Sequence, residues 1–436
     1  MQPKSDSKSG LIVPARKIVV PSAAAAALLP ERGAHGAPSY ALKLALVGCG
    51  GRGTGAAVQA MNTSNSVHLV ALGEVDQSQL DKTLKIISTQ KPDQVSVPKE
   101  RQFVGFDAYK KAIAECDVVI LATPPGFRPM MFEEAVRQGK HVFMEKPVAV
   151  DAPGVRKILK AAKVAKEKNL KTAVGMQRRH QPAYEELAKR VHDGAIGDLH
   201  TLRVYWLGNS RDGKERLPEE REIVYQIRNW YYFTWLSGDH IVEQHIHNID
   251  VGNWLKQAYP IRANGQGGRQ VRKAKRHCQI YDHHYVEYEY ADGSRMISEC
   301  RQIRGCFPHV AEYAHGTKGN AAMPPGGRLY EISGPKAWSQ RLQKREDGHQ
   351  LEHYPFFNAI QENKPYAEAE YGAKSTMVAI MGRMATYSGK MVTWDQAFNS
   401  ELTEMPDELG YHVMPKVLPD ENGLYPIAQP GTTKSW

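Results

Sequence analysis

The chain has 436 residues, of which 42% are hydrophobic and 24% charged, near the averages for soluble globular proteins. This composition excludes a wholly disordered chain, a collagen and a coiled coil, and no apolar run approaches the ~18 residues of a membrane-spanning helix. The 57 basic and 47 acidic residues leave a net charge of +10, which is too dispersed to indicate a nucleic-acid partner. The length is typical of two or three domains.

Residues 1–40 differ from the rest of the chain and are set apart as a leader or a disordered tail. Arg16-Lys17 is followed by IVVPSAAAAALLP, a stretch without charge, and then by small residues at Ala34 and Gly36. A basic region, a short apolar region and a small-residue exit come in the order of a secretory leader. The pattern therefore favours export through a twin-arginine-type leader, and the alternative is a tail on a cytoplasmic protein.

A glycine-rich loop lies between the first predicted strand (42–47) and a helix pattern that begins at AAVQAM. Its GxGxxG spacing is weak evidence alone, but the strand-to-helix context gives it meaning. The glycines permit a tight turn, close approach of a pyrophosphate, and close packing of helix on strand. The loop residues expected to contact a dinucleotide are Gly48, Gly50, Gly51, Arg52 and Gly53.

Two acids end the second predicted strand (67–76). Glu74 lies 21 residues after Gly53, and Asp76 lies 23 residues after it. An acid near this offset can accept hydrogen bonds from both ribose hydroxyls and would repel a 2′-phosphate. The spacing favours NAD over NADP, although Arg52 could pair with a phosphate.

Strands and helices go on alternating after these acids. DVVILA reads as a buried strand, a helix pattern follows it, and HVFMEKP contains the next strand. Such alternation is typical of βαβ units and predicts a parallel sheet within a Rossmann domain at residues 41–172.

The second half of the chain has a different pattern. HTLRVYW, YVEYEY and RMISEC alternate with the period of antiparallel strands, and ADGS between the last two is a good hairpin turn. We expect an α/β domain at 173–394, with helices at 353–361 and 373–388. A Pro- and Gly-rich strap is expected at 395–436, across the surface or a neighbouring subunit.

Motifs spread from about residue 41 to 398 resemble those of the Gfo/Idh/MocA oxidoreductase family. They are GCGGRG, ATPPGFRP, GKHVFMEKP, VGMQRRHQPAY, GDHIVEQHIHNID, GTKG and EYGAKSTMVAIMGRMATYSGK. The resemblance implies a Rossmann domain followed by an α/β domain with an open, mostly antiparallel sheet that often makes oligomer contacts. It therefore implies a homo-oligomer, a dimer or tetramer, and nicotinamide-dependent chemistry on sugars, polyols or their derivatives.

The resemblance also implies further site residues. Those expected at the cofactor are Thr123, Pro124, Pro125, Glu145, Lys146 and Gln177. Arg178 and Arg179 are expected to line the substrate cleft, with the alternative that at least one of them forms an inter-domain ion pair instead. Trp230 and Tyr231 precede the active segment, and aromatic faces suit sugar rings, although such clusters are more often core. Family members usually have a histidine where Arg128 stands, which puts cofactor contact there in doubt.

Lys146 lies in Glu145-Lys146-Pro147, at the end of a predicted strand where Rossmann sheets bind their ligands. A lysine there can donate to a substrate hydroxyl and stabilise a developing alkoxide. The family often has a cis peptide at the position of Pro147.

The segment 237–255 supplies the remaining chemistry. His240, Glu243 and His247 follow the i, i+3, i+7 spacing of one polar helix face. Histidine can take a hydroxyl proton near neutral pH, and Glu243 can orient a substrate hydroxyl or hold the imidazole. The family commonly has an aspartate in place of Glu243, so the longer acid leaves the substrate uncertain.

These residues predict a dehydrogenase of a sugar, polyol or glycoside, in which His247 removes the carbinol proton and Lys146 stabilises the oxygen. One alternative is an NAD-dependent glycosidase that acts by transient oxidation and elimination. Another is a non-catalytic, ligand-sensing family member, but Lys146 and His247 both being present argues against it.

The same segment could in principle bind a metal, because His240, Glu243, His245 and His247 lie within eight positions. The HExxH spacing is absent, and His245 points off the face of the other three. No metal is expected; a rival site would join Glu243 and His247 to a distant ligand. The five cysteines include no CxxC pair, so neither a disulfide framework nor a four-cysteine zinc site is expected.

Overall fold

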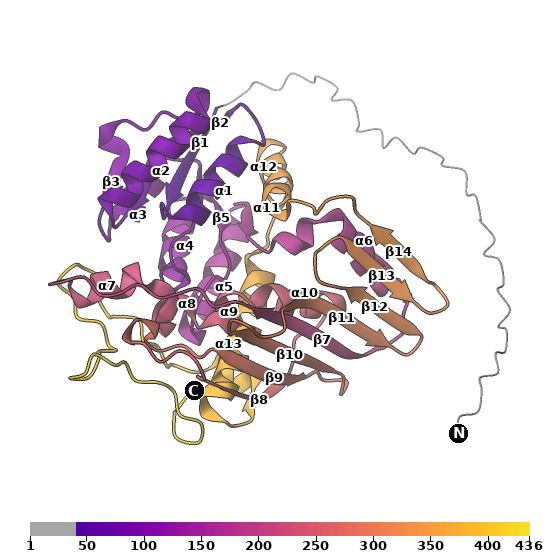
Figure 1. Cartoon of the computed structure of the whole chain (residues 1–436). Helices are drawn as coiled ribbons and strands as arrows, with labels where there is room; N and C mark the ends of the chain where they lie inside the picture. Colours follow the sequence, from indigo (N-terminus) through magenta and orange to yellow (C-terminus); the bar gives the residue numbers. More distant parts are fainter. Residues whose placement is uncertain (1–40) are drawn as a thin grey trace, which may run out of the picture. The chain divides into compact units, whose positions relative to one another are not determined.

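The computed structural model describes residues 41–436, and the leader predicted within residues 1–40 lies outside this range. The described chain contains one sheet of six strands and one of nine (Figure 1). Among these residues, none of the helices combines the length and apolar character that crossing a bilayer would need. The predicted α/β class, with a Rossmann domain and a second α/β domain, is confirmed.

The six-stranded sheet is wholly parallel, in the Rossmann order β3-β2-β1-β4-β5-β6. The order reverses between β1 and β4, and ligands bind beyond the carboxyl ends of the strands at such a point. Its last strand ends at Val174, beyond the expected domain boundary at 172, because β6 pairs with β5. The strands are Leu42–Val47 (β1), Val67–Glu74 (β2), Gln102–Val104 (β3), Val118–Leu121 (β4), His141–Met144 (β5) and Thr172–Val174 (β6).

Helices cover both faces of this sheet, and one of them comes from the far end of the chain. In α12, the rings of Phe356 and Phe357 are fully buried in one cluster with Leu44 and Leu46 of β1. Burying such a ring contributes roughly 1.5–3 kcal/mol. On this face lie α1 (Gly51–Met61), α2 (Gln77–Gln90) and α12 (His353–Gln361); on the other lie α3 (Ala108–Ala114), α4 (Arg128–Arg137) and α5 (Ala152–Glu167).

The nine-stranded sheet is mostly antiparallel, as expected, in the order β14-β13-β12-β11-β7-β10-β9-β8-β15. Only β7 and β10 pair in parallel among its described strands. The strands are Leu199–Gly208 (β7), Arg262–Gly268 (β8), His283–Glu289 (β9), Arg295–Gln302 (β10), His309–Gly316 (β11), Gly319–Met323 (β12), Leu329–Ser333 (β13), Trp338–Arg341 (β14) and Val392–Thr393 (β15).

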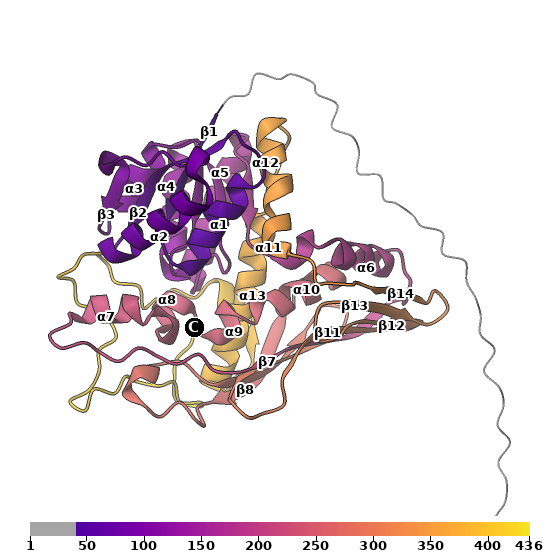
Figure 2. The ribbon, with the colours of Figure 1, turned by 45° about the horizontal axis from the view of Figure 1, so that its top comes forward.

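Helices pack against one face of this second sheet, chiefly α6, α10 and α13 (Figure 2). On the opposite face, Arg203 lies over the rings of Tyr205 and Tyr313 at 5.4 and 5.5 Å, and Tyr285 is 43% exposed. A homo-oligomer through this face stays a prediction. The helices of this half are Pro182–His192 (α6), Glu222–Arg228 (α7), Thr234–Ser237 (α8), His240–Glu243 (α9), Ile246–Lys256 (α10), Gly348–Leu351 (α11), Ala369–Ser388 (α13) and Trp394–Phe398 (α14).

The C-terminal segment lacks regular structure, but it begins later than predicted. Helix α14 occupies the first residues of the expected strap at 395–436. Residues 399–436 contain neither helix nor strand and are called the C-terminal strap below. All five cysteines are free, and four of them are buried.

Several buried histidines make the fold sensitive to acid. Burial lowers the pKa of His245 to about 3 and holds the pKa values of His240, His247 and His353 well below the usual range. The unfolded chain binds protons at these side chains near pH 6.5, whereas the folded chain does not, so folding loses stability as the pH falls below 6.5. Each contributes on the order of 1.4 kcal/mol per pH unit.

One carboxyl acts in the opposite sense, because the buried Glu352 has a raised pKa and binds a proton more readily in the folded chain. His180 beside Glu368 also has a raised pKa, but below pH 6.5 its ring is protonated in both states and adds no pH dependence there. With four histidines opposed by one carboxyl, we expect the free energy of unfolding to fall by roughly 4 kcal/mol per pH unit below pH 6.5. Urea unfolding at pH 7.5 and 5.5 measures this fall.

A variant with one less buried histidine provides the comparison. His353 stacks on Phe143 with ring centroids 4.3 Å apart, so His353→Phe keeps the stack and removes one titrating ring. It is expected to reduce the pH dependence by about 1.4 kcal/mol per unit. Equal stability at the two pH values would contradict the expectation.

Candidate active site

The glycine-rich loop after β1 adopts a backbone that only glycine fits at two positions. Gly48 has φ +96°, and a Cβ there would lie 2.5 Å from the backbone nitrogen of Thr123. A Cβ on Gly53 would lie 2.0 Å from the carbonyl oxygen of Gly48. The loop therefore packs on the β4–α4 connection, while a Cβ on Gly50 would meet nothing within 4 Å. This open backbone at the start of the 11-residue helix α1 fits a pyrophosphate.

The two acids that follow β2 have different roles. Glu74 turns back to the loop, where its carboxylate accepts from the backbone N–H of Cys49 (2.6 Å) and of Val75 (2.7 Å). Burial raises the pKa of Glu74, although these backbone donors oppose the rise. Asp76 instead caps α2, accepting from the backbone N–H of Ser78 at 2.8 Å. Glu74 is therefore the better candidate for a ribose, and Asp76 is engaged by its helix.

Arg52 is also engaged. Its Nε lies 2.9 Å from a carboxylate oxygen of Glu145, and its guanidinium donates to Gln59. Because its guanidinium already contacts Glu145 and Gln59, Arg52 is a poor partner for a 2′-phosphate. The preference for NAD over NADP predicted from the sequence is therefore kept.

Arg128 lies at the position where family members usually have a histidine. In this structure its side chain has a structural role. The side chain is 1% exposed and donates to the carbonyl oxygens of Leu121 (2.7 Å) and Thr123. It thereby braces the connection that contains Thr123, Pro124 and Pro125 from the inside.

Lys146 and Glu243 meet across the two domains. Lys146 follows β5 and precedes Pro147 in a cis peptide bond, as the resemblance implied. Its ammonium donates to the backbone carbonyl of Glu243 at 2.5 Å and to the Oε1 of Glu243 at 3.2 Å. The side chains of Lys146 and Glu243 are 10% and 11% exposed. The Oε2 of Glu243 is buried without a protein partner, which leaves an acceptor for a bound molecule.

His247 lies beside this pair, in the first turn of α10. Burial lowers the pKa of His247, and the nearby ammonium of Lys146 lowers it further, so the imidazole is neutral at pH 7. Its Nδ1 has no protein partner. The ring stacks on Trp206 of β7, with centroids 6.1 Å apart and planes 23° apart. A neutral, held imidazole next to an ammonium suits proton exchange with a hydroxyl.

The predicted polar face of His240, Glu243 and His247 does not form, because the helix breaks. α9 ends at Glu243 and α10 begins at Ile246, with Gln244 (φ −106°, ψ −52°) between them. His240, which the sequence analysis groups with Glu243 and His247 as a candidate substrate contact, is fully buried, and a substrate role for it stays a prediction. Glu243 and His247 still converge, because α10 restarts within two residues.

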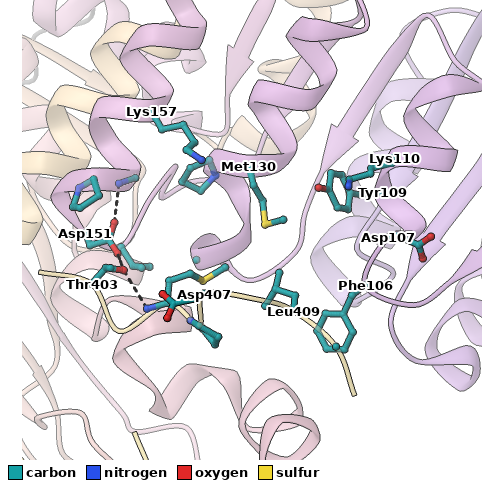
Figure 3. Close-up of a pocket in the computed structure, with 18 of the residues that line it drawn as sticks. Phe106, Asp107, Tyr109, Lys110, Met130, Asp151, Lys157, Thr403, Asp407 and Leu409 are labelled. Carbon is teal, nitrogen blue, oxygen red and sulfur yellow. Dashed lines mark hydrogen bonds between the residues drawn. The ribbon is translucent and has the colours of Figure 1, made fainter. Parts of the chain in front are cut away.

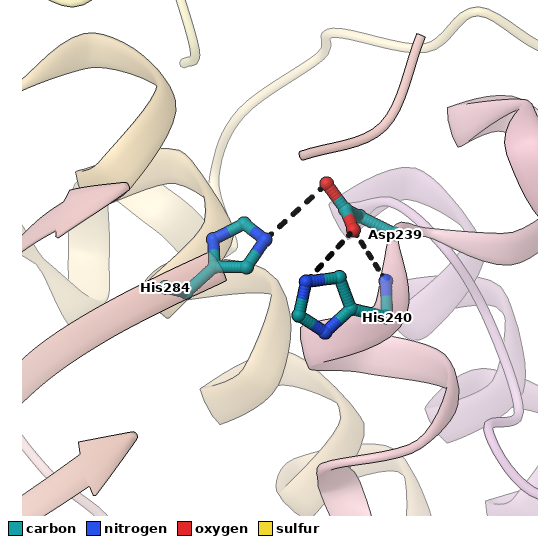
Figure 4. Close-up of side chains that lie close together, drawn as sticks. All are labelled: Asp239, His240 and His284. Carbon is teal, nitrogen blue, oxygen red and sulfur yellow. Dashed lines mark hydrogen bonds and ion pairs between the residues drawn. The ribbon is translucent and has the colours of Figure 1, made fainter. Parts of the chain in front are cut away.

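His240 belongs instead to the Asp239 cluster, which consists of Asp239, His240 and His284 (Figure 4). The Asp239 carboxylate accepts from the backbone N–H of Tyr281 (2.9 Å), the hydroxyl of Tyr387 (2.6 Å) and the backbone N–H of His240. His284 Nε2 lies 3.3 Å from it.

The Asp239 cluster is the one group of potential metal ligands found among residues 41–436, and it is not the set considered from the sequence. Burial would raise the pKa of Asp239, but the imidazole of His284 holds it below its usual range. With two donors converging on Oδ2 and the imidazole of His284 at 3.3 Å, this geometry is that of a hydrogen-bonded carboxylate.

The other expected substrate residues are mostly engaged within the protein. Arg178 pairs with Glu312 and is 7% exposed. Arg179 makes two bonds to Asp250, at 2.8 and 2.9 Å. Both arginines therefore form ion pairs, but within the second domain and not between the two domains as the sequence analysis allowed.

The other residues expected at the site, Tyr231, Trp230 and Gln177, have fewer hydrogen bonds and ion pairs within the protein. The hydroxyl of Tyr231 accepts from Gln302 at 2.7 Å. Trp230 is half-buried beside it, with ring centroids 5.7 Å apart. Gln177 begins a 3₁₀ turn against Gly348. Cofactor and substrate roles for these residues stay predictions.

Two residues near this site were missed by the sequence analysis. Trp206 is the last residue of HTLRVYW, a segment whose alternating side chains predict a strand. No nearby residue in the sequence indicates that Trp206 contacts His247. His349 lies on α11, where burial lowers its pKa to about 4 and Arg52 contributes to that shift. Gln350 holds α11 on α1 by donating to the carbonyl of Gln59 at 3.1 Å. No signal in the sequence predicts that contact.

Comparisons with known proteins agree with the fold described above. The sequence profile of the Gfo/Idh/MocA oxidoreductase family, with an NAD-binding Rossmann fold, matches residues 42–176. Inositol 2-dehydrogenase of Rhizobium meliloti is 29% identical over 213 residues, which cover 49% of this chain and 58% of that protein. The match therefore spans less than two thirds of this curated relative.

Solved structures share the fold over most of the described chain. Levoglucosan dehydrogenase, in complex with NADH and levoglucosan, has a TM-score of 0.66 at 16% identity and covers 81% of this chain and 100% of its own. Aldose–aldose oxidoreductase from Caulobacter crescentus has a TM-score of 0.64 at 20% identity, and the match covers 81% of this chain and 99% of that protein. The profile match and the related inositol dehydrogenase show that residues 42–176 form an NAD-binding Rossmann domain like that of the Gfo/Idh/MocA oxidoreductases, and the chain as a whole is similar to proteins of that family.

Proposed function

We propose that the protein is an NAD-dependent oxidoreductase that moves a hydride between a carbinol of a polyol or sugar and the nicotinamide. The observation that carries this proposal is the meeting of Lys146, Glu243 and His247 beyond β5, close to the glycine-rich loop. The names of the relatives, an inositol dehydrogenase and a levoglucosan dehydrogenase, support polyols and sugars as the substrate class.

The chain's own residues would divide the work at one oxygen atom. The neutral imidazole of His247 takes the proton of the carbinol hydroxyl, or returns it in the reverse direction. The ammonium of Lys146 donates to the same oxygen and stabilises its developing negative charge. Bound NAD supplies the hydride acceptor.

Glu243 orients the substrate. Its Oε1 is held by Lys146, and its Oε2 has no protein partner. A carboxylate oxygen in this state accepts a hydrogen bond from a second hydroxyl, next to the reacting carbinol. This favours a vicinal diol, a grouping that both sugars and cyclic polyols contain.

An assay with NAD and a panel of inositols, aldoses and anhydrosugars tests the proposal, with NADH followed by its absorbance. We expect NADH to form with at least one cyclic polyol or sugar, and NADP to replace NAD poorly because Glu74 would repel a 2′-phosphate. Release of sugar from a glycoside without net NADH would replace this proposal by the closed-cycle glycosidase. Export and oligomeric state stay predictions.

A further inference from the structure

The C-terminal strap is tied to the Rossmann domain at its beginning. Arg156 of α5 donates to the carbonyl oxygen of Ser400 (2.9 Å) and to the carboxylate of Glu401 (2.7 Å). The hydroxyl of Thr403 then donates to Asp151 at 2.6 Å. These contacts fix the direction in which the strap leaves α14.

The strap next reaches the residues that end β2. The hydroxyl of Tyr411 donates to the carbonyl oxygen of Val75 at 2.5 Å. Val75 lies between Glu74 and Asp76, and Glu74 is the proposed ribose ligand. The ring of Tyr411 packs edge-on against Phe106, which follows β3, with centroids 5.0 Å apart. Burial raises the pKa of Tyr411, and Glu74 and Asp76 raise it further, which agrees with this position.

A cavity of about 790 Å³ lies beneath this part of the strap (Figure 3). One wall is the strap itself, including Thr403, Leu409 and Tyr411, and the facing wall belongs to the Rossmann domain, including Phe106 and Met130. Lys146 and His247 do not line it. The strap therefore covers the side of the Rossmann domain at the ends of β2 and β3, away from the reacting groups.

Beyond this point the strap is fastened to the second domain. Gln226 of α7 donates to the carbonyl of Val417 at 2.8 Å, and Tyr425 donates to Glu222 at 2.5 Å. Because the strap is held at both ends, Tyr411 cannot leave Val75 without breaking other contacts.

We propose that Tyr411 is a positioning residue, through which the C-terminal strap closes the adenosine end of the NAD site and makes release of the dinucleotide slow. This rests on the proposed function and extends it. The hydroxyl holds the backbone between the two acids, and the ring, with Phe106, covers the carboxyl ends of β2 and β3. Release of NAD then requires the strap to lift.

The test measures NADH dissociation from the full chain. Protein loaded with NADH is mixed with excess NAD, and the loss of bound NADH fluorescence gives the dissociation rate. Tyr411→Ala is expected to raise that rate at least ~10-fold, since it removes a hydrogen bond and an aromatic contact. Tyr411→Phe keeps the ring and is expected to raise it less.

Met414→Ala is the matched control, because it shortens a side chain of the same strap that is 64% exposed and takes no part in the contacts described. Its dissociation rate should stay within about twofold of the wild type. An unchanged rate in both Tyr411 variants overturns the inference, as does an equal rise in Met414→Ala, which would indicate general loosening. If the wild type binds no NADH at all, the proposed function itself is wrong.

Discussion

Replacing His247 by alanine is expected to lower turnover by ~10²–10⁴-fold, the usual contribution of a positioned general base. The loss should appear in kcat, because the imidazole acts on the carbinol proton and makes no contact that the structure assigns to NAD. NADH binding, measured by fluorescence titration, should stay close to the wild-type value. Steady-state kinetics with the best substrate of the panel provide the measurement.

His245→Ala is the control for this variant. His245 lies two residues earlier, is equally buried, and bonds to the hydroxyl of Ser298 at 2.8 Å, away from Lys146. Its replacement should cost stability but retain turnover. Near-normal kcat in His247→Ala would remove this histidine from the mechanism, and an equal loss in His245→Ala would point to a structural effect.

Replacing Lys146 by methionine is expected to have two separable effects. Turnover should fall by ~10²–10³-fold, since one donor to the developing alkoxide is removed. The free energy of unfolding should also fall by ~3–5 kcal/mol, because Glu243 is left as a buried carboxylate without its cation. Urea unfolding and kcat measure the two effects independently.

The double variant Lys146→Met, Glu243→Gln separates catalysis from stability. A neutral amide at position 243 no longer needs the ammonium, so most of the lost stability should return while turnover stays low. Recovery of turnover in the double variant would show that Lys146 only neutralises Glu243. No loss of stability in the single variant would mean that water, not Lys146, satisfies the carboxylate.

The parts of the site that lie on single strands and turns could be predicted from the sequence. The strand at 42–47, the glycine spacing and the acid at Glu74 depend on neighbours a few residues apart, and the structure places them as expected. Lys146 could be placed at a ligand-binding edge because parallel strands all end on one side. These inferences need only local periodicity and the topology of βαβ units.

The helix face at 237–255 is where local reasoning failed. The spacing of His240, Glu243 and His247 assumes one continuous helix. The break at Gln244 ends α9 and separates His240 and Glu243 from His247, so the single helix face does not exist. The carboxylate of Asp239 accepts from Tyr281 and Tyr387, which are far along the chain, so no local pattern could reveal this arrangement.

The sequence by itself determined the dinucleotide loop, the two kinds of sheet, and the lysine, acid and histidine that we propose for the chemistry. Only the tertiary structure decided that Arg128 braces a loop, that α12 covers the Rossmann sheet, and that Tyr411 reaches Val75. The physical reason is the separation along the chain of the residues that interact. Strand and helix periodicity is set by neighbours within a few residues, whereas the hydrogen bond from Tyr411 to Val75 joins positions 336 residues apart and exists only once both domains have folded.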